Sequence, residues 1–246
     1  MLYLALLFYF LSFFSGLFHS NRLWASLLMG LALSFYLAHL AVAHITQKTF
    51  PLGDLHGFVS LLGNLFVLTF LFVSYKYKAL LYFNYLVAFL GLLATLFTLP
   101  SSISPYKSTL YSLHFISASL SYLFAFIGGM SSSLKLFIEK RLKNHSLFQA
   151  YVPLNSLRTA EKLFTSLAFL GFTITLIFGS LWTRTQFGRH WIDDPKLLIT
   201  LFLWLYFALL SHLNLLKKLK PRRFSEGVIV GALLSLMSLI FIRHSF

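Results

Sequence analysis

Between Trp182 and His212, the sequence concentrates side chains that could hold a ligand. A polar, aromatic-rich segment comes first and leads into an apolar helix that ends in the histidine. The candidate binding side chains are aromatic rings, cations and carboxylates: Trp182, Arg184, Phe187, Arg189, His190, Trp191, Asp193 and Asp194. Aromatic faces and cations together can bind a flat, anionic and mostly apolar molecule. Haem has these properties.

Three of the nine histidines are placed where an imidazole could ligate haem iron. His114 is about five residues into a predicted membrane helix, roughly 8 Å below one surface, and His244 is at the end of the last predicted helix. Both fall at the same predicted membrane level as segment 182–194. His212 is roughly 24 Å from the start of its own helix, close to the opposite surface. Imidazole is a common axial ligand of haem iron.

Several of these residues have a simpler alternative explanation. An intramembrane histidine can serve only to pack against a neighbouring helix, and Trp182 and Trp191 could be interfacial anchors. Asp194 followed by Pro195 is typical of a helix N-cap, so this carboxylate is expected to cap a helix rather than to act as an acid or base. His56 fits either role. The remaining histidines are expected to be interfacial: His19, His39, His44, His145 and His190.

The composition sets the class of protein. Apolar residues make up 58% of the 246 positions and charged residues only 11%, far below the roughly 25% of a soluble domain. The chain is therefore expected to be a polytopic membrane protein that contacts membrane lipids. It has no cysteine, which excludes disulfides, Fe–S clusters and thiolate nucleophiles. The net charge of +14 is explained by basic loops and not by nucleic-acid binding.

An all-α fold of about eight transmembrane helices is predicted, forming one domain over residues 1–246. The first apolar run has no basic region before it and no small-residue cleavage site, so it is expected to be a helix of the mature protein. Apolar runs long enough to cross a core of roughly 30 Å occur at 2–19, 23–45, 56–74, 79–99, 109–134, 163–182, 196–216 and 225–243.

The distribution of basic residues predicts the orientation of these helices. Of the 20 lysines and arginines, fourteen fall in one alternating set of loops and six in the other. The positive-inside rule puts the first set, including the basic loop 135–162, in the cytoplasm and both termini in the periplasm or its equivalent. The segment 182–196 then faces outward. Arg184 and Arg189 lie in this outward segment, where the positive-inside rule expects few basic residues. Their presence favours a role such as pairing with haem propionates.

The outward segment resembles the tryptophan-rich WWD motif of the cytochrome c assembly family. The family pattern is approximately W-A-x₃-W-G-x₂-W-x-W-D-P-K-E, followed by a helix that ends in Tyr-Leu-His. This sequence has phenylalanine and aspartate where the pattern has its second and fourth tryptophans, and leucine in place of the glutamate. The matching positions are Trp182, Gly188, Trp191, Asp194, Pro195, Lys196 and His212.

Other stretches are similar to the CcsA/ResC branch of this family, and HemX-like members are near relatives. His114 followed by six residues and Ser121-Tyr122 is similar to a helix that carries a haem ligand in that branch. Residues 50–55, Phe-Pro-Leu-Gly-Asp-Leu, resemble a stretch that opens one of its helices. The final residues, 243–246, resemble its Leu-His-Ser-Tyr ending. Together the resemblance extends over residues 50–246.

The resemblance implies a function in cytochrome c biogenesis by system II. Haem b would enter from the cytoplasmic side at His212 and move to an outer site, where His114 and His244 would ligate the iron. The loop residues would hold the macrocycle with its vinyl groups presented to apocytochrome c: Trp182, Arg184, Phe187, Gly188, Arg189, Trp191 and Asp194. The implied partners are a CcsB/ResB-like membrane subunit, apocytochrome c and, indirectly, a thioredoxin-like thiol reductant. The implied location is the bacterial cytoplasmic membrane, or the thylakoid membrane for a plastid protein.

Two alternatives remain open at the level of the sequence. A HemX-like accessory or regulatory protein of haem metabolism would have the same fold without synthase activity, and the altered motif and short chain favour it. An unrelated transporter or structural membrane protein would have histidines that only pack. Retention of His114, His212 and His244 instead favours the biogenesis function described above, as a subunit of a holocytochrome c synthase or haem lyase.

Overall fold

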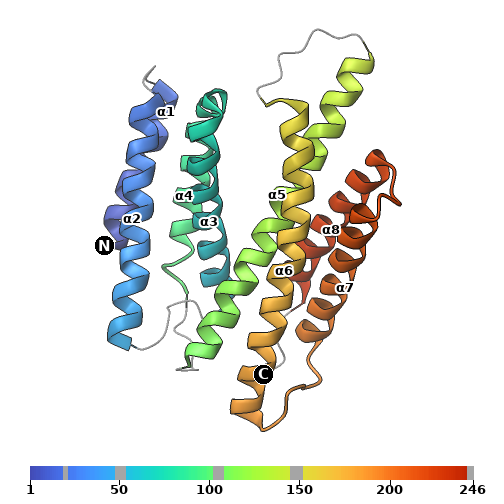
Figure 1. The fold of residues 1–246 in the computed structure, drawn as a ribbon. Helices are drawn as coiled ribbons and strands as arrows, with labels where there is room; N and C mark the ends of the chain where they lie inside the picture. Colours follow the sequence, from blue (N-terminus) through green and yellow to red (C-terminus); the bar gives the residue numbers. More distant parts are fainter. Residues whose placement is uncertain (19–21, 48–53, 102–107, 145–151, 243–246) are drawn as a thin grey trace. The chain divides into compact units, whose positions relative to one another are not determined.

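The computed structural model describes residues 1–18, 22–47, 54–101, 108–144 and 152–242 (Figure 1). Every regular element in these ranges is helical, which confirms the predicted all-α class. The elements in chain order are α1 (Leu2–Phe18), α2 (Arg22–Gln47), α3 (Leu55–Lys76), the 3₁₀ helix η1 (Lys78–Phe83), α4 (Asn84–Leu96), α5 (Thr109–Lys143), α6 (Leu154–Phe187), α7 (Pro195–Leu215) and α8 (Pro221–Phe241).

The helices begin and end differently from the prediction at three places. The run 79–99 divides into η1 and the shorter α4. Both α5, with 35 residues, and α6, with 34, are roughly 50 Å long and exceed the apolar runs that predicted them. The basic loop predicted at 135–162 is therefore mostly helical where the structure describes it. Hydropathy predicts how much of a helix can lie in lipid, and a helix can continue into water with charged residues.

Within the described ranges, six helices are long and apolar enough to cross a membrane: α2, α3, α5, α6, α7 and α8. The helix α1, with 17 residues, and the apolar helical stretch Leu80–Leu96 are shorter. These features are those of a multi-pass membrane protein, as predicted. By length, α1 spans roughly 25 Å, slightly less than the hydrocarbon core.

The described chain forms two compact units, residues 1–112 and 113–246. In the first unit, Tyr9 of α1 packs with Met29 and Val67. The Tyr9 hydroxyl donates to Asn64 Oδ1 at 2.8 Å, and Asn64 Nδ2 donates to Thr95 Oγ1 at 3.1 Å. Unsatisfied polar groups are costly in lipid, so these bonds hold α1, α3 and α4 in one arrangement.

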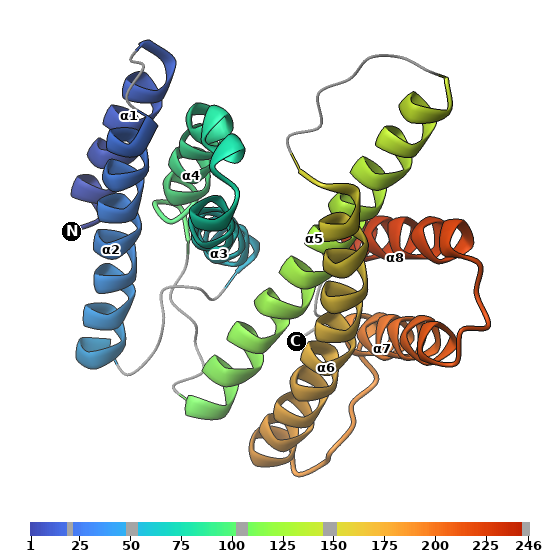
Figure 2. The same ribbon diagram turned by 45° about the horizontal axis from the view of Figure 1, so that its top comes forward.

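In the second unit, α7 and α8 lie side by side and pack against α6 (Figure 2). Small residues let the backbones approach closely. A Cβ at Gly171 of α6 would lie only 2.7 Å from Ser121 Oγ of α5, and one at Gly231 of α8 would lie 2.9 Å from the Phe207 ring of α7. Close approach at glycines is the usual way in which membrane helices gain packing contacts.

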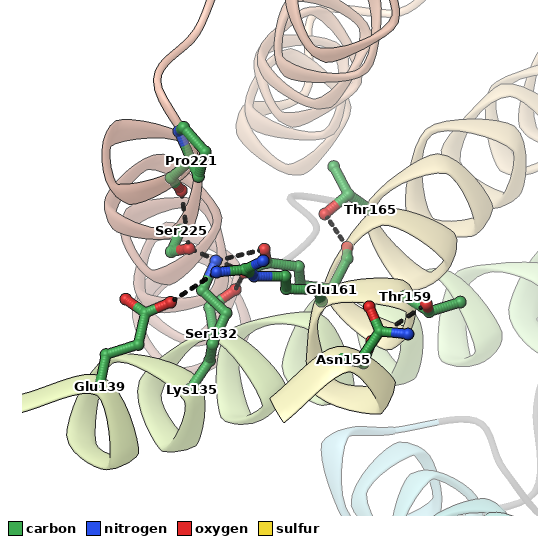
Figure 3. Close-up of polar contacts among 10 residues, drawn as sticks. Ser132, Lys135, Glu139, Asn155, Thr159, Glu161, Thr165, Pro221 and Ser225 are labelled. Atoms are coloured by element: carbon green, nitrogen blue, oxygen red, sulfur yellow. Dashed lines mark hydrogen bonds and ion pairs between the residues drawn. The ribbon is translucent and has the colours of Figure 1, made fainter. Parts of the chain in front are cut away.

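A buried ion pair fastens α5, α6 and α8 at the ends of these helices remote from segment 188–194. Lys135 of α5 donates to Glu161 Oε1 of α6 at 2.5 Å, and both side chains are excluded from solvent. Ser132 of α5 and Ser225 of α8 donate to the other carboxylate oxygen at 3.1 and 2.8 Å. Figure 3 shows these three side chains pointing toward Glu161. The carboxylate is thus neutralised and hydrogen-bonded by two neighbouring helices.

Candidate functional site

Helix α6 ends at the motif glycine and not before the motif. Trp182 and Thr183 are buried within its last turns, and Phe187 is its last residue. Gly188 then adopts a left-handed conformation with φ of 71°, and its N–H donates to the Arg184 carbonyl at 3.0 Å. Glycine at this position is the usual residue of a helix C-terminus. The prediction of a loop from 182 was therefore wrong for residues 182–187, and the loop is 188–194.

The aromatic residues of the motif divide into one that packs and two that are exposed. Trp182 is 2% exposed, and its ring meets that of Phe187 edge to face with centroids 5.8 Å apart. Phe187 and Trp191 are 40% and 41% exposed. Trp182 thus supports the end of α6 from inside, whereas Phe187 and Trp191 are the aromatic residues of the motif that are partly exposed.

Two loop residues line one side of an open cavity of about 250 Å³ between α6 and α7. Its lining combines aliphatic side chains with hydroxyls, an imidazole and an indole: Leu176, Gly179, Ser180, Thr183, His190, Trp191, Leu197 and Leu201. Thr183 donates to the backbone carbonyl of His190 at 3.0 Å, which fixes the loop against α6. Apolar walls with a few placed polar groups are typical of ligand sites.

His190 has two side-chain partners at this cavity. Its Nδ1 is 3.1 Å from Ser180 Oγ, and its Nε2 is 3.2 Å from a guanidinium nitrogen of Arg184. Arg189 is exposed on the same loop. From the sequence, His190 belongs to the candidate binding segment but is expected to be interfacial, and its position at the cavity is not predicted. Its spacing of ten residues from Ser180 gives no signal, because the contact depends on the turn at Gly188.

The motif residues Asp194 and Lys196 have structural partners. Asp194 is fully buried, and its carboxylate accepts from the Leu197 N–H at 3.0 Å, which confirms the predicted N-cap of α7. Lys196 Nζ donates to the Ser238 carbonyl of α8 at 2.8 Å and lies 5.4 Å from the centre of the Tyr122 ring of α5. This part of the motif therefore starts α7 and attaches it to α5 and α8.

His114 lies on α5 against α6, near the cavity. Its Nδ1 is 2.9 Å from the Thr175 carbonyl. A Cβ at Gly179, which lines the cavity, would come within 3.0 Å of the His114 ring. Since a carbonyl only accepts, Nδ1 carries the proton and the lone pair of the neutral ring is on Nε2. That tautomer is the one suited to binding a metal through Nε2.

His212 lies on the exposed side of α7, at the other end of the α6–α7 contact. Its Nδ1 is 2.7 Å from the Ala208 carbonyl, so its lone pair is also on Nε2. The edge of its ring meets Phe169 of α6, with centroids 5.8 Å apart. Trp204 stacks near the same Phe169 ring at 6.1 Å and donates to Thr173 at 2.8 Å. Phe169 and Thr173 were not predicted, because only the packing of α6 on α7 reveals them.

The two described candidate ligands are well separated. His114 contacts α6 at Gly179 and His212 contacts it at Phe169, ten residues away and so roughly 15 Å along the axis. His244 lies outside the described residues. In the described part of the chain, no group of three or more histidines or carboxylates could hold a metal ion by itself. One or two imidazoles suffice for an iron that a porphyrin already holds.

Comparison with known proteins identifies the family of the chain. The family described as Cytochrome C assembly protein matches residues 2–246, and the chain belongs to that family. A curated relative is the "Cytochrome c biogenesis protein CcsA" of Cyanidium caldarium, which is 39% identical over 66 residues. The aligned stretch covers 26% of this chain and 22% of that relative. No solved structure matches the chain significantly. The protein is thus a member of the cytochrome c assembly family with several helices that could cross a membrane.

Proposed function

We propose that this protein carries haem b across the membrane and presents it for thioether attachment to apocytochrome c. The observation that supports this most is the state of the two described imidazoles. His114 and His212 each donate Nδ1–H to a backbone carbonyl, so each has the Nε2 lone pair that iron ligation requires.

The residues have distinct roles in this proposal. His212, beside Phe169 and Trp204, receives haem at the cytoplasmic side, where aromatic rings can stack on the porphyrin. His114 and His244 ligate the iron at the outer side. Loop 188–194 holds the macrocycle with the exposed rings of Trp191, within the loop, and of Phe187, just before it.

The remaining motif residues support that outer site. Arg184 and Arg189 are the cations available to the propionates, and Trp182, Gly188 and Asp194 shape the loop from within. Haem is the cargo in this scheme, and the apocytochrome supplies the thiols that this cysteine-free chain lacks. The whole chain, 1–246, acts as a single haem-handling domain.

The family and the distribution of basic residues support the setting that we propose. Both termini lie in the periplasm or its equivalent, and the membrane is the bacterial cytoplasmic or the thylakoid membrane. A CcsB/ResB-like subunit completes the synthase, and a thioredoxin-like reductant keeps the apocytochrome thiols reduced.

An absorption spectrum of the detergent-purified protein tests the ligand assignment. The wild type should show six-coordinate haem. His114→Ala or His244→Ala should remove or alter that spectrum, and added imidazole should restore it, because free imidazole can take the vacated position. His212→Ala should reduce the amount of haem loaded. His39→Ala, a histidine of α2, is the matched control and should leave the spectrum unchanged. Unchanged spectra in all three variants would reject the assignment.

A HemX-like regulatory role is the second candidate, favoured by one observation. The motif tryptophan that remains at 182 is buried, and an exposed aspartate replaces the tryptophan expected at 193. The loop therefore offers fewer aromatic faces than the family pattern. Coexpression with a CcsB/ResB-like subunit and a c-type reporter separates the two candidates. Covalent haem on the reporter supports the synthase, and haem-loaded protein without covalent product supports the regulator.

A further inference from the structure

The connection between α7 and α8 carries a dense group of cations. Residues 216–220 join Leu215 to Pro221, and five of the seven positions 217–223 are lysine or arginine. Both helices are long and apolar enough to cross a membrane, which puts their connection at a membrane surface. We call its five basic residues, all exposed, the basic turn: Lys217, Lys218, Lys220, Arg222 and Arg223.

The protein has almost no negative charge with which to balance the basic turn. The chain has only six carboxylate side chains. Asp54 belongs to the first unit, and Asp193 and Asp194 lie at the other end of α7. The remaining three are already paired: Glu161 with Lys135, Glu139 with Arg158 and Glu226 with Arg222. Four cations of the basic turn therefore have no carboxylate partner in the described part of the chain.

Cations elsewhere in the protein lie against aromatic rings. The Arg22 guanidinium lies 3.0 Å from the centre of the Tyr82 ring, and Lys78 Nζ lies 4.7 Å from that of Tyr75. Such pairs are typical of interfacial anchors. Within the described ranges, no ring covers the four unpaired cations of the basic turn in this way, so their charges are open to an anion from outside the protein.

The backbone holds the basic turn in one conformation. The N–H groups of Lys217 and Lys218 donate to the carbonyls of Asn214 and Leu213, both at 3.0 Å, and close the end of α7. Leu219 packs against the hydrophobic cluster that α7 and α8 share. Lys217 has a φ of 53°, a left-handed conformation that favours glycine. A lysine at such a position favours a use for its side chain.

We propose that the basic turn binds the phosphate headgroups of anionic membrane lipids. A headgroup phosphate supplies the missing negative charge and accepts charge-assisted hydrogen bonds from lysine and arginine. A cluster of about four to eight such cations next to a membrane helix favours anionic lipid, and each cation near the surface contributes roughly a fivefold preference. Leu215 and Leu216 come directly before the basic turn and are 72% and 63% exposed, so they can contact the acyl chains of the same lipids.

The absence of cysteine from the chain allows a site-specific test. Leu216→Cys gives a full-length protein with a single thiol, which an uncharged fluorophore labels beside the basic turn. The labelled protein is reconstituted into phosphatidylcholine vesicles that contain a small fraction of nitroxide-labelled phosphatidylglycerol or, in parallel, of nitroxide-labelled phosphatidylcholine. The ratio of quenching by these two lipids measures the local preference for the anionic headgroup.

The labelled protein should be quenched at least about threefold more by the anionic lipid at about 0.1 M salt. The ratio should approach one at about 1 M salt, where the Debye length is only about 3 Å. Lys217→Gln/Lys218→Gln/Lys220→Gln should bring the ratio close to one at the lower salt concentration as well. Lys217→Arg/Lys218→Arg/Lys220→Arg retains the charges and should keep the preference.

Two further variants separate this site from surface charge in general and from a structural role. Lys140→Gln/Arg141→Gln/Lys143→Gln removes the same charge from the end of α5 and is the matched control, which should retain the ratio. Lys217→Gly relieves the left-handed lysine, so it should raise the thermal stability while it lowers the ratio. Circular dichroism checks that each variant is folded, and the single variant tests the proposal even if the triple variant does not fold.

Three results would overturn the proposal. The two lipids would quench the labelled protein equally, as expected if an acidic protein segment and not lipid covers the basic turn. The glutamine variant would keep the ratio of its parent. The control at the end of α5 would lose as much of the ratio as the variant of the basic turn. The inference is independent of haem handling, which none of these results would contradict.

Discussion

Removing one partner of the buried pair of Lys135 and Glu161 should strongly destabilise the second unit. Glu161 accepts hydrogen bonds from Lys135, Ser132 and Ser225, and neither charge reaches solvent. Glu161→Gln removes the negative charge and leaves the Lys135 ammonium buried without its counter-ion. Breaking a buried pair in this way costs about 3–5 kcal/mol. Lys135→Met leaves the carboxylate with only its two serine donors and should cost a similar amount.

Removing both charges should be much less costly than removing either. In Lys135→Met/Glu161→Leu, neither ion must be desolvated, and apolar side chains fill the space. Replacement of a buried pair by apolar residues is often neutral or stabilising by about 1–4 kcal/mol. The double variant should therefore be at least about 2 kcal/mol more stable than each single variant.

An unfolding titration in mixed detergent micelles, followed by circular dichroism, measures these differences. Glu226→Gln is the matched control, because Glu226 pairs with Arg222 at 2.9 Å on the exposed surface of α8. It should change stability by about 0.5 kcal/mol or less. Two results would contradict this prediction. Glu161→Gln would lower the free energy of unfolding no more than Glu226→Gln, or the double variant would lower it by the sum of the two single effects.

Two further predictions concern the candidate site. Gly179→Ala puts a methyl group within 3.0 Å of the His114 ring and should shift the haem spectrum, whereas Gly30→Ala, which meets nothing within 4 Å, should not. An unshifted spectrum for Gly179→Ala would contradict the placement of His114. Lys196→Met loses the charged bond to the Ser238 carbonyl and should lower the free energy of unfolding by about 1.5–3 kcal/mol, measured by the same titration. A change below about 0.5 kcal/mol would argue against that tether.

The sequence predicted the helices well because each apolar run is bounded by polar or basic residues. It placed the ends of α5 and α6 poorly, since hydropathy falls at Lys140 and Arg141 while the helix continues through them. Asp194 and Pro195 were predicted correctly, because an N-cap and a first-turn proline act within four residues.

The parts of the site that were not predicted depend on contacts between distant residues. Trp182 was expected in a ligand-holding loop, but only the left-handed Gly188 shows where α6 stops. The contacts of His190 with Ser180 and Arg184 could not be predicted, because they form only where the chain reverses direction after α6. The pairing of Lys135 with Glu161 likewise follows from how α5 crosses α6, and no local pattern encodes that crossing.

The long helix α6 connects the surroundings of His114 and His212. Its Thr175 carbonyl holds one imidazole and its Phe169 ring contacts another, while Glu161 anchors its far end. A shift of α6 along its axis by the rise of one residue, roughly 1.5 Å, would change the contacts of both imidazoles together. If each imidazole binds a ligand as proposed, a ligand that favours one position of α6 at one imidazole must alter the affinity at the other by the same factor.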